Sequence, residues 1–417
     1  MRVNKFLIAA FSVSMLMACK KEGCTDQAAT NYDSKAKNDD GSCVYDTNTP
    51  GGGGAGGGTT GPNGETLPIR LTGTETDPIL IKDMSTNPSV SDYYIDGVWK
   101  AGADVTIEPG VNIEMRAGAY IVVESNGSMN ATGTPSNKIQ ILGAEDEKGF
   151  WNYIRYESND TKNKLIHCNV SHGSGTWQAE GMISVISNAS LTVQNSTITK
   201  GDQYGLFVSN PDGKLPNFKS NHFDNFNKNP ISLWTFEQSG TLDNTTTFGA
   251  NNLVDEIRVH GDSYSNSVSV PKLNLPYYLA TDFNINGGDT GFMSGIDLIM
   301  GPNTTINVNN LGSLSFDGTA SDRINVYGAS GIKGYWESIV LTTNSTDNSF
   351  SYTNFNYGGG TWNNEATLYM RGGALAMDNC DIKNGDMMAV GDDGNGTFID
   401  NGGNTWSDCD DGGGLLP

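Results

Sequence analysis

Carboxylates are the residues of this chain whose spacing most directly allows chemistry. The chain has 47 Asp and Glu against 25 Lys and Arg, which gives a formal net charge of −22. Residues 23–43 hold Asp26, Asp33, Asp39 and Asp40, and hard oxygen ligands at this density could bind a Ca²⁺ ion. The alternative is that they are turn residues of a small module. The negative charge argues against nucleic acid as a partner, and against anionic polysaccharide unless cations bridge the two.

The body of the chain also has adjacent aspartates, Asp392 and Asp393. Neighbouring residues of a strand point to opposite faces, so we interpret this pair as an acidic loop rather than as a catalytic pair. None of the four histidines has zinc-ligand spacing with a cysteine or another histidine. These histidines are His167, His172, His222 and His260. Motif spacing therefore assigns no catalytic residue.

Tryptophans form the second group of residues that could contact a ligand, because exposed aromatic faces stack on sugar rings. The chain has seven, and four of them form two equivalent pairs, Trp151 with Trp336 and Trp177 with Trp362. We consider all four as glycan contacts, with packing of the fold as the alternative. Retention in both halves of the chain favours packing for Trp151 and Trp336, and it leaves both interpretations open for Trp177 and Trp362.

These tryptophan pairs belong to an internal duplication. The sequence "HGSGTW" at 172–177 matches "YGGGTW" at 357–362, and the match extends back without a gap to Lys138 in the first copy and Arg323 in the second. His172 is equivalent to Tyr357, so we expect a packing role for His172. A regular repeat of this length indicates a solenoid, which stacks similar units along one axis.

The duplicated region consists of short β-branched segments that alternate apolar with polar residues and are separated by Gly, Asn, Asp and Pro. The segments "VTIEPGVNIEM", "GSMNATGT", "KIQILGA" and "KGFWNYI" resemble those of right-handed parallel β-helix proteins from Bacteroidota. The resemblance implies an all-β, right-handed parallel β-helix over 66–410, with copies at about 93–226 and 277–406. The corners in "LTVQNSTI" and "LAMDNCDI" place an asparagine where the backbone turns left-handed, and we expect such corners to stack into a ladder.

The second copy departs from the first near its start. It looks shorter between Ile306 and Gly312, so we expect a skipped or shortened coil wall there. The tyrosine pairs at 93–94 and 277–278 look like equivalent starts of the two copies.

Three cysteines fall within the predicted solenoid, two of them in the duplicated copies and Cys409 just beyond the second copy. Cys168 is equivalent to Thr353 and Cys380 to Ser196, so both occupy positions of small residues. A disulfide between Cys380 and Cys409 is one arrangement, and it leaves Cys168 as a buried free thiol.

The N-terminus carries an export signal. Arg2 and Lys5 precede an apolar run at 6–17, which is typical of a signal peptide over residues 1–18. The sequence "LMAC" that ends at Cys19 resembles the lipobox of bacterial lipoproteins, which implies that Cys19 is lipidated and anchors the protein to a membrane. We expect an outer-membrane anchor, with the protein on the cell surface or on the periplasmic face. A plain secretory peptide is the alternative.

The sequence "GCTDQAATNYDSKAKNDDGSC" at 23–43 resembles a short module of secreted Bacteroidota proteins. The resemblance implies a disulfide between Cys24 and Cys43, which an exported chain can keep. A glycine-rich segment then acts as a flexible linker. The expected layout is a signal peptide at 1–18, the module at 19–46, the linker at 47–65, the solenoid at 66–410 and a tail at 411–417.

The function hypotheses follow from this layout. The pectin-degrading β-helix hydrolases carry N-T-D, D-D, G-H-G and R-I-K in that order, and the chain lacks this content and order. Our first hypothesis is therefore a non-enzymatic lipoprotein that binds a glycan or mediates adhesion as a monomer. It predicts an aromatic and amide strip without converging acids. A polysaccharide lyase or glycoside hydrolase would instead have a cleft with clustered Asp, Arg or Lys, and a structural spacer would have neither.

Overall fold

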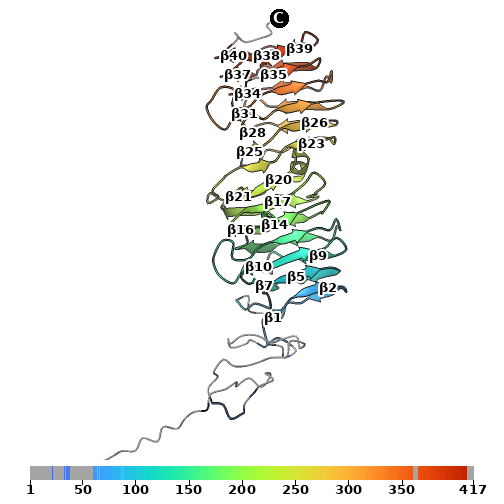
Figure 1. The fold of residues 1–417 in the computed structure, drawn as a ribbon, viewed down its shortest axis with the longest axis vertical. Coiled ribbons are helices and arrows are strands. Elements are labelled where there is room, and N and C mark those ends of the chain that lie inside the picture. Colours follow the sequence, from blue (N-terminus) through green and yellow to red (C-terminus); the bar gives the residue numbers. More distant parts are fainter. Residues whose placement is uncertain are drawn as a thin grey trace, which may run out of the picture.

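The computed structural model describes residues 66–410 apart from 86, 88 and 360–364, together with 21, 32, 34–37, 60–62 and 64. Within these residues the chain forms an all-β parallel solenoid of about 13 turns, consistent with the predicted right-handed parallel β-helix (Figure 1). The predicted fold class is thus confirmed. Several predicted sites lie outside the described residues. They are Cys19, Cys24, Cys43, Asp26, Asp33, Asp39, Asp40 and Trp362.

One sheet, here called the long sheet, runs through the whole solenoid. It contains 14 parallel strands, each paired with a strand of the next coil. A spacing of about 4.8 Å between neighbouring strands gives a rod of roughly 60 Å. Its strands are β2 (Gly73–Glu75), β5 (Val98–Ala101), β8 (Tyr120–Val123), β11 (Ile154–Tyr156), β14 (Gly181–Val185), β17 (Tyr204–Val208), β20 (Ile231–Leu233), β22 (Ile257–Val259), β25 (Tyr277–Leu279), β28 (Asp297–Met300), β31 (Ile324–Gly328), β34 (Thr353–Asn356), β37 (Asp381–Lys383) and β40 (Thr405–Ser407).

Two further sheets complete the N-terminal half. The eight-stranded sheet contains β1 (Ile69–Arg70), β4 (Tyr93–Ile95), β7 (Asn112–Met115), β10 (Ile139–Gly143), β13 (Cys168–Ser171), β16 (Thr197–Gly201), β19 (His222–Phe226) and β21 (Thr247–Phe248). A six-stranded sheet contains β3 (Ile79–Ile81), β6 (Asp104–Ile107), β9 (Ser128–Thr132), β12 (Lys164–Ile166), β15 (Thr192–Gln194) and β18 (Phe218–Lys219).

Two other six-stranded sheets complete the C-terminal half. The first contains β23 (Asp262–Tyr264), β26 (Phe283–Ile285), β29 (Ile306–Val308), β32 (Ile339–Leu341), β35 (Ala366–Met370) and β38 (Met388–Asp392). The second contains β24 (Val268–Val270), β27 (Asp289–Met293), β30 (Ser313–Asp317), β33 (Ser349–Ser351), β36 (Ala374–Asp378) and β39 (Thr397–Asp400).

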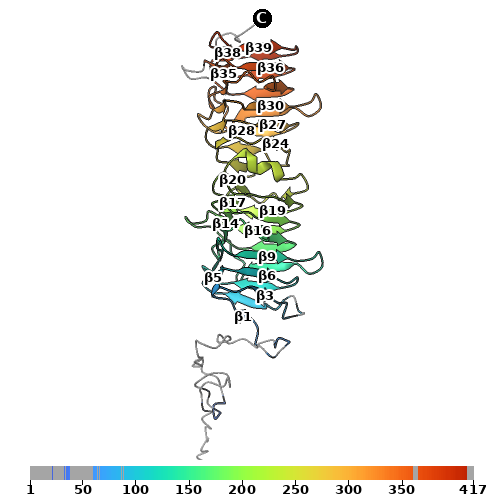
Figure 2. The ribbon, with the colours of Figure 1, turned by 90° about the vertical axis from the view of Figure 1, so that its right-hand side faces the viewer.

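The two halves meet where the arrangement of the sheets changes. A short 3₁₀ helix, η1 (Phe236–Thr241), follows β20 at mid-height of the rod (Figures 1 and 2). The eight-stranded sheet ends at β21, the sheet of β23 begins directly after β22, and only the long sheet continues through the junction. As a result, the strands equivalent to β10, β13 and β16 are β31, β34 and β37, which belong to the long sheet. Equivalent strands of the two copies therefore lie on different sides of the coil, shifted by one strand position.

The duplication extends further than the sequence comparison indicated. Val111 to Met115 align with Ile296 to Met300 at the same separation along the chain as the two tryptophan-containing motifs, so β7 corresponds to β28 and β8 to β29. Of the expected skipped or shortened coil wall, the skipped alternative is wrong, because β29 occupies that position, and the wall is shorter, since β29 has three residues where β8 has four. The expected equivalent starts are confirmed, since the two tyrosine pairs begin β4 and β25.

The asparagine corners have the predicted geometry. Asn195 and Asn379 have φ values of 51° and 52°. The corners on either side of Asn195 carry His167 and Ser220, which have φ values of 51° and 53°. The left-handed conformation therefore recurs from coil to coil, but the expected asparagine ladder is wrong at this position, because different residue types fill equivalent corners.

Inward side chains form one continuous core along the rod. Its C-terminal half contains a run of phenylalanines, in which Phe292 and Phe316 have ring centroids 5.0 Å apart and Phe316 and Phe350 have centroids 4.9 Å apart. Cys168 and Cys380 are both completely buried free thiols, as predicted for Cys168. Cys409 is also free, so the Cys380–Cys409 disulfide is absent.

Candidate functional site

The paired tryptophans Trp151 and Trp336 have a structural role. Trp151 and Trp336 are 0% exposed, and each indole N–H donates to the backbone at the end of a strand in the next coil. Trp151 Nε1 lies 2.7 Å from the Ser171 carbonyl oxygen, and Trp336 Nε1 lies 2.9 Å from that of Asn356. A fully buried indole offers no face to a ligand, so the burial supports the packing interpretation for this pair.

Trp177 is available to a ligand. Its side chain is 87% exposed at the tip of the loop between β13 and β14, where Thr176 and Ala179 form an antiparallel bridge. Ala179 packs against Val122 and Tyr153 on the outer face of the long sheet. The loop therefore holds Trp177 beside that face, and its role as a glycan contact stays a prediction.

A row of side chains on the outer face of the long sheet forms a better-defined surface. It crosses six consecutive strands, β17 to β31, in unbroken register, so it extends over about 24 Å at a strand spacing of about 4.8 Å. Each residue faces outward because its neighbours on the strand point into the core. This row, here called the strip, consists of Phe207, Ser232, Arg258, Tyr278, Ile299 and Tyr327.

Aromatic rings lie beside cations at two places on the strip and its border. The Arg258 guanidinium lies 5.8 Å from the Tyr278 ring centroid, within the range of cation–π attraction. At the other end, the rings of Tyr204 and Phe207 stack with centroids 5.7 Å apart, and Lys228 Nζ lies 4.7 Å from the Tyr204 centroid. The surface therefore presents flat faces together with positive charge.

Glu256 borders the strip from the start of β22. Burial raises the pKa of its carboxyl group, and the charge of Arg258 opposes this rise. Burial also raises the pKa of Tyr278 and of Tyr327. Burial lowers the pKa of His260, and the positive charge of Arg258 lowers it further. Glu256 is thus a carboxyl group of raised pKa beside the guanidinium.

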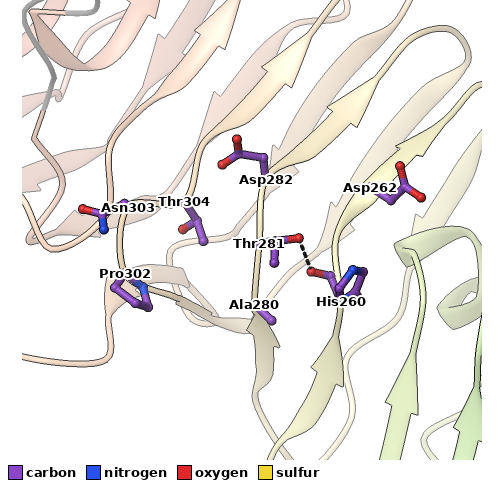
Figure 3. Close-up of a pocket in the computed structure, with 8 residues that line it drawn as sticks. All are labelled: His260, Asp262, Ala280, Thr281, Asp282, Pro302, Asn303 and Thr304. Carbon is purple, nitrogen blue, oxygen red and sulfur yellow. Dashed lines mark hydrogen bonds between the residues drawn. The ribbon is translucent and has the colours of Figure 1, made fainter.

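A hollow of about 400 Å³ lies alongside the strip, at three successive corners between the long sheet and the sheet of β23 (Figure 3). The Trp234 and His260 rings lie against each other at one end of the hollow, with centroids 4.2 Å apart and planes tilted by 31°. Asn303 N donates to the Tyr335 carbonyl oxygen over 2.9 Å, so the loop after β31 borders the other end. The hollow is lined by His260, Asp262, Ala280, Thr281, Asp282, Pro302, Asn303 and Thr304.

Side chains from the strands fix the polar surroundings. Trp234 Nε1 donates to Asp262 Oδ2 over 2.8 Å. Thr281 Oγ1 donates to the His260 carbonyl oxygen over 2.7 Å (Figure 3). In the row beside the strip, Asn325 Nδ2 donates to Asp297 Oδ1 over 2.7 Å, and the next coil continues the chain of amides with Asn354. Carboxylates, amides and a hydroxyl group therefore lie beside the aromatic residues.

The first copy has the same column of residues, but its surface is closed. Arg70 faces Tyr94 in register on the eight-stranded sheet, as Arg258 faces Tyr278 on the long sheet. Arg70 forms an ion pair with Asp96 at 2.8 Å. The Arg116 guanidinium covers the Tyr94 ring at 4.5 Å and leaves that residue 8% exposed.

The second copy lacks these covering groups. Ala280 stands at the position of Asp96, and Gly301 at the position of Arg116. A Cβ atom on Gly301 would lie 3.2 Å from the Tyr278 hydroxyl oxygen, so the glycine also leaves room for that phenol. The same column of the repeat is therefore covered by charged side chains in the first copy and open in the second.

A second difference between the copies involves His172, for which we predicted a packing role. Its Nε2 lies 3.0 Å from Asp146 Oδ1, which also accepts from Lys200 Nζ. His172 has a φ of 70°, and its equivalent Tyr357 has a φ of 62°. Both residues thus fill the same left-handed corner, and the histidine adds a polar tie to the loop of the first copy.

The sequence alone did not reveal the strip, because its members lie on separate coils and come into register only when the coils stack. One signal was present in the sequence. Ala280 and Gly301 replace Asp96 and Arg116 beside the equivalent tyrosine, so the loss of charged residues from one copy marks the surface.

Comparison with models of protein families, with curated proteins and with solved structures finds no match. In the described part of the chain, no group of three or more His, Cys, Asp or Glu side chains is arranged to hold a metal ion. Across the same residues, no helix has the length and apolar character needed to cross a membrane.

Proposed function

We propose that this protein binds a glycan, without chemical change, along the strip and the adjoining hollow. The observation that carries the proposal is the row in which Phe207, Arg258, Tyr278 and Tyr327 are partly exposed, with the buried Ser232 and Ile299 at the strip positions between them. Sugar rings expose flat faces of C–H groups that pack on aromatic rings, and their hydroxyls pair with amides and charged groups. The strip and its border supply both kinds of partner.

The geometry of the solenoid suits an extended ligand. Strands repeat every ~4.8 Å, which is close to the rise of one sugar residue in an extended chain. A glycan that runs along the rod therefore meets an equivalent position on each coil. Tyrosine and tryptophan contribute contact area with little loss of side-chain freedom, because each has only two rotatable side-chain bonds.

The proposed location follows from the sequence rather than from the solenoid. A lipid on Cys19 would anchor the protein to the outer membrane, and the disulfide module with its glycine-rich linker would hold the solenoid away from the bilayer. In this arrangement the strip can reach polysaccharide outside the membrane.

Affinity electrophoresis tests the proposal directly. The full-length protein is run through gels that each contain a plant, algal or host polysaccharide. We expect retardation by at least one polymer, and Tyr327→Ala to weaken that binding by about tenfold, as for a buried aromatic contact. The control is Leu311→Ala, because Leu311 is 89% exposed in the turn between β29 and β30. Absence of retardation in every gel, or equal retardation of the Tyr327 variant and the wild type, contradicts the proposal.

A lyase or hydrolase is the second candidate, and one pair of carboxyl groups favours it. Glu256 precedes β22 and Asp297 begins β28, two strands apart on the outer face, so their backbones lie about 10 Å apart. Inverting glycosidases use two carboxyl groups about 6.5–9.5 Å apart, with the pKa of one of them raised, and backbones at this spacing allow such a pair. Burial raises the pKa of Glu256.

Mass spectrometry of the same polysaccharides after incubation, with and without Ca²⁺, tests this candidate. Hydrolysis or elimination would release oligosaccharides, an unsaturated end would indicate a lyase, and Glu256→Gln would abolish release while keeping the binding. Intact polymers in every incubation would contradict the enzyme candidate and leave the binding proposal in place.

A further inference from the structure

Arg258 is unusual among the arginines of the solenoid because, within the described residues, no carboxylate forms an ion pair with it, although the charge of the nearby Glu256 carboxyl group acts on it. Four arginines form ion pairs with acids, at 2.5 to 3.3 Å. These pairs are Arg70–Asp96, Arg116–Glu114, Arg155–Glu157 and Arg323–Asp381. Within the described residues, Arg258 forms neither an ion pair nor a hydrogen bond through its side chain. Its guanidinium therefore keeps all of its donors available in a chain where acids outnumber bases by 47 to 25.

The first copy shows what a carboxylate does at this position. Arg70 Nε donates to Asp96 Oδ1 over 2.8 Å, and Asp96 lies two residues beyond the tyrosine that faces this arginine. In the second copy the residue two positions beyond Tyr278 is Ala280, which lines the hollow. The alanine removes the acid and leaves space in the same place.

We propose that the carboxylate of a uronic acid residue in the bound glycan docks on Arg258, in the place that Asp96 occupies beside Arg70. This inference rests on the proposed glycan binding and specifies the class of sugar. The guanidinium presents parallel N–H donors that match the two oxygens of a carboxylate. The sugar ring then lies against Tyr278, and its hydroxyls reach the polar groups of the hollow.

Charges around the strip restrict the ligand further. Lys228, beside Tyr204, also lacks an ion pair within the described residues, so a second cation borders the same face. The net charge of −22 opposes a dense polyanion at a distance. The inferred ligand is therefore a mainly neutral glycan with scattered uronic acid residues, rather than a fully charged polyuronate.

Matched ligands isolate the carboxylate. Glucuronoxylan and gum arabic are each used before and after chemical reduction of their carboxyl groups to alcohols, and binding to the full-length protein is measured by affinity electrophoresis. We expect the wild type to bind the native form of at least one polymer about tenfold or more tightly than its reduced form, as for a charge-assisted contact.

Matched variants isolate the arginine. Ala280→Asp restores the ion pair of the first copy, and Arg258→Gln removes the charge. Both variants should bind the native polymer no better than the reduced one. Asp96→Ala is the control, because it frees the equivalent Arg70 outside the proposed site and should keep the preference of the wild type. Circular dichroism and the unfolding temperature verify that each variant is folded.

The outcomes separate the two proposals. Equal binding of native and reduced polymers by the wild type overturns the uronate inference and leaves glycan binding in place. The same holds if the wild type binds only neutral polymers of the wider panel. A preference for the native form that survives both Ala280→Asp and Arg258→Gln overturns the assignment to Arg258. Failure to bind any polymer overturns glycan binding as well.

Discussion

The two copies of the repeat keep the same interior and differ on their outer surfaces. Trp151 and Trp336 fill the same buried position and donate to equivalent carbonyl groups. On the outside, Tyr94 is covered by Arg116, whereas Tyr278 is partly exposed beside Ala280. Packing constrains the inward residues of both copies, because a change of one methylene in a close-packed core costs stability. Outward residues are free to diverge, so divergence between copies indicates where a binding surface formed.

Because equivalent strands of the two copies lie in different sheets, the divergent surface has different neighbours in each copy. The column that begins with Arg70 lies on the eight-stranded sheet, and this sheet stops at β21. The equivalent column that begins with Arg258 lies on the long sheet, where it continues the row of Phe207 and Ser232 from the first half. An open surface in the second copy therefore extends across the junction between the halves.

The largest difference between parts of the chain should be in the rates at which its cysteine thiols are alkylated. Burial raises the pKa of the Cys168 and Cys380 thiols to about 12, and both side chains are completely buried. We expect both to resist alkylation in the native protein and to react only on unfolding, while the partly exposed Cys409 reacts first. Peptide mapping after timed alkylation measures the three rates. Early modification of Cys168 would show that the core of the first copy is less closed than that of the second.

Replacement of the paired tryptophans should have the largest effect on stability. Trp151→Ala and Trp336→Ala should each reduce the free energy of unfolding by about 3–5 kcal/mol, because each removes a buried ring and a hydrogen bond. Trp177→Ala should change it by less than about 0.5 kcal/mol, since that side chain is 87% exposed. Urea unfolding of the three variants tests this. A large difference between Trp151 and Trp336 would break the equivalence of the two interiors.

A smaller effect is expected from pH. As the pH falls from 7 toward the raised pKa of Glu256, protonation removes a negative charge beside Arg258, so a uronate should bind more tightly. His260, whose pKa is lowered, gains charge only at a lower pH and acts in the same direction, whereas Tyr278 and Tyr327 stay neutral throughout. A gain of up to about fivefold corresponds to one screened charge interaction.

Titration of the binding constant between pH 7 and pH 5 measures this gain, in a range where the uronate itself stays ionised. Glu256→Gln should bind more tightly at pH 7 and lose most of the pH dependence. An unchanged pH profile in this variant would assign the effect to another group.

The smallest effect should come from opening the first copy. Asp96→Ala removes the ion pair with Arg70. The Arg70 side chain is 47% exposed and the Asp96 side chain 32%. Such surface pairs contribute about 0–1 kcal/mol to stability, so the unfolding midpoint should hardly change. A loss well above about 1 kcal/mol would mean that the charged cover of the first copy is structural, and the contrast between the copies would then lose its functional meaning.

The sequence predicted the scaffold better than the site. Alternating apolar residues and the left-handed corners at Asn195 and Asn379 depend on local chemistry, so the β-helix and the equivalent strands could be recognised. A skipped wall was one of the two predicted alternatives and is wrong, because "INV" and "YIVV" share few residues although both are strands. The junction at η1 could not be foreseen, since the phase of the coils depends on pairing between distant strands. The strip depends on that same pairing.

The most direct test of the account compares the two equivalent tyrosines. Tyr278→Ala and Tyr94→Ala remove the same side chain from the same position of the repeat, one from the open surface and one from the closed surface. Affinity for the retained polysaccharide is measured for both variants and for the wild type. The account predicts that Tyr278→Ala loses about tenfold or more in affinity and that Tyr94→Ala binds like the wild type. Equal losses in both variants, or a loss confined to Tyr94→Ala, would contradict it.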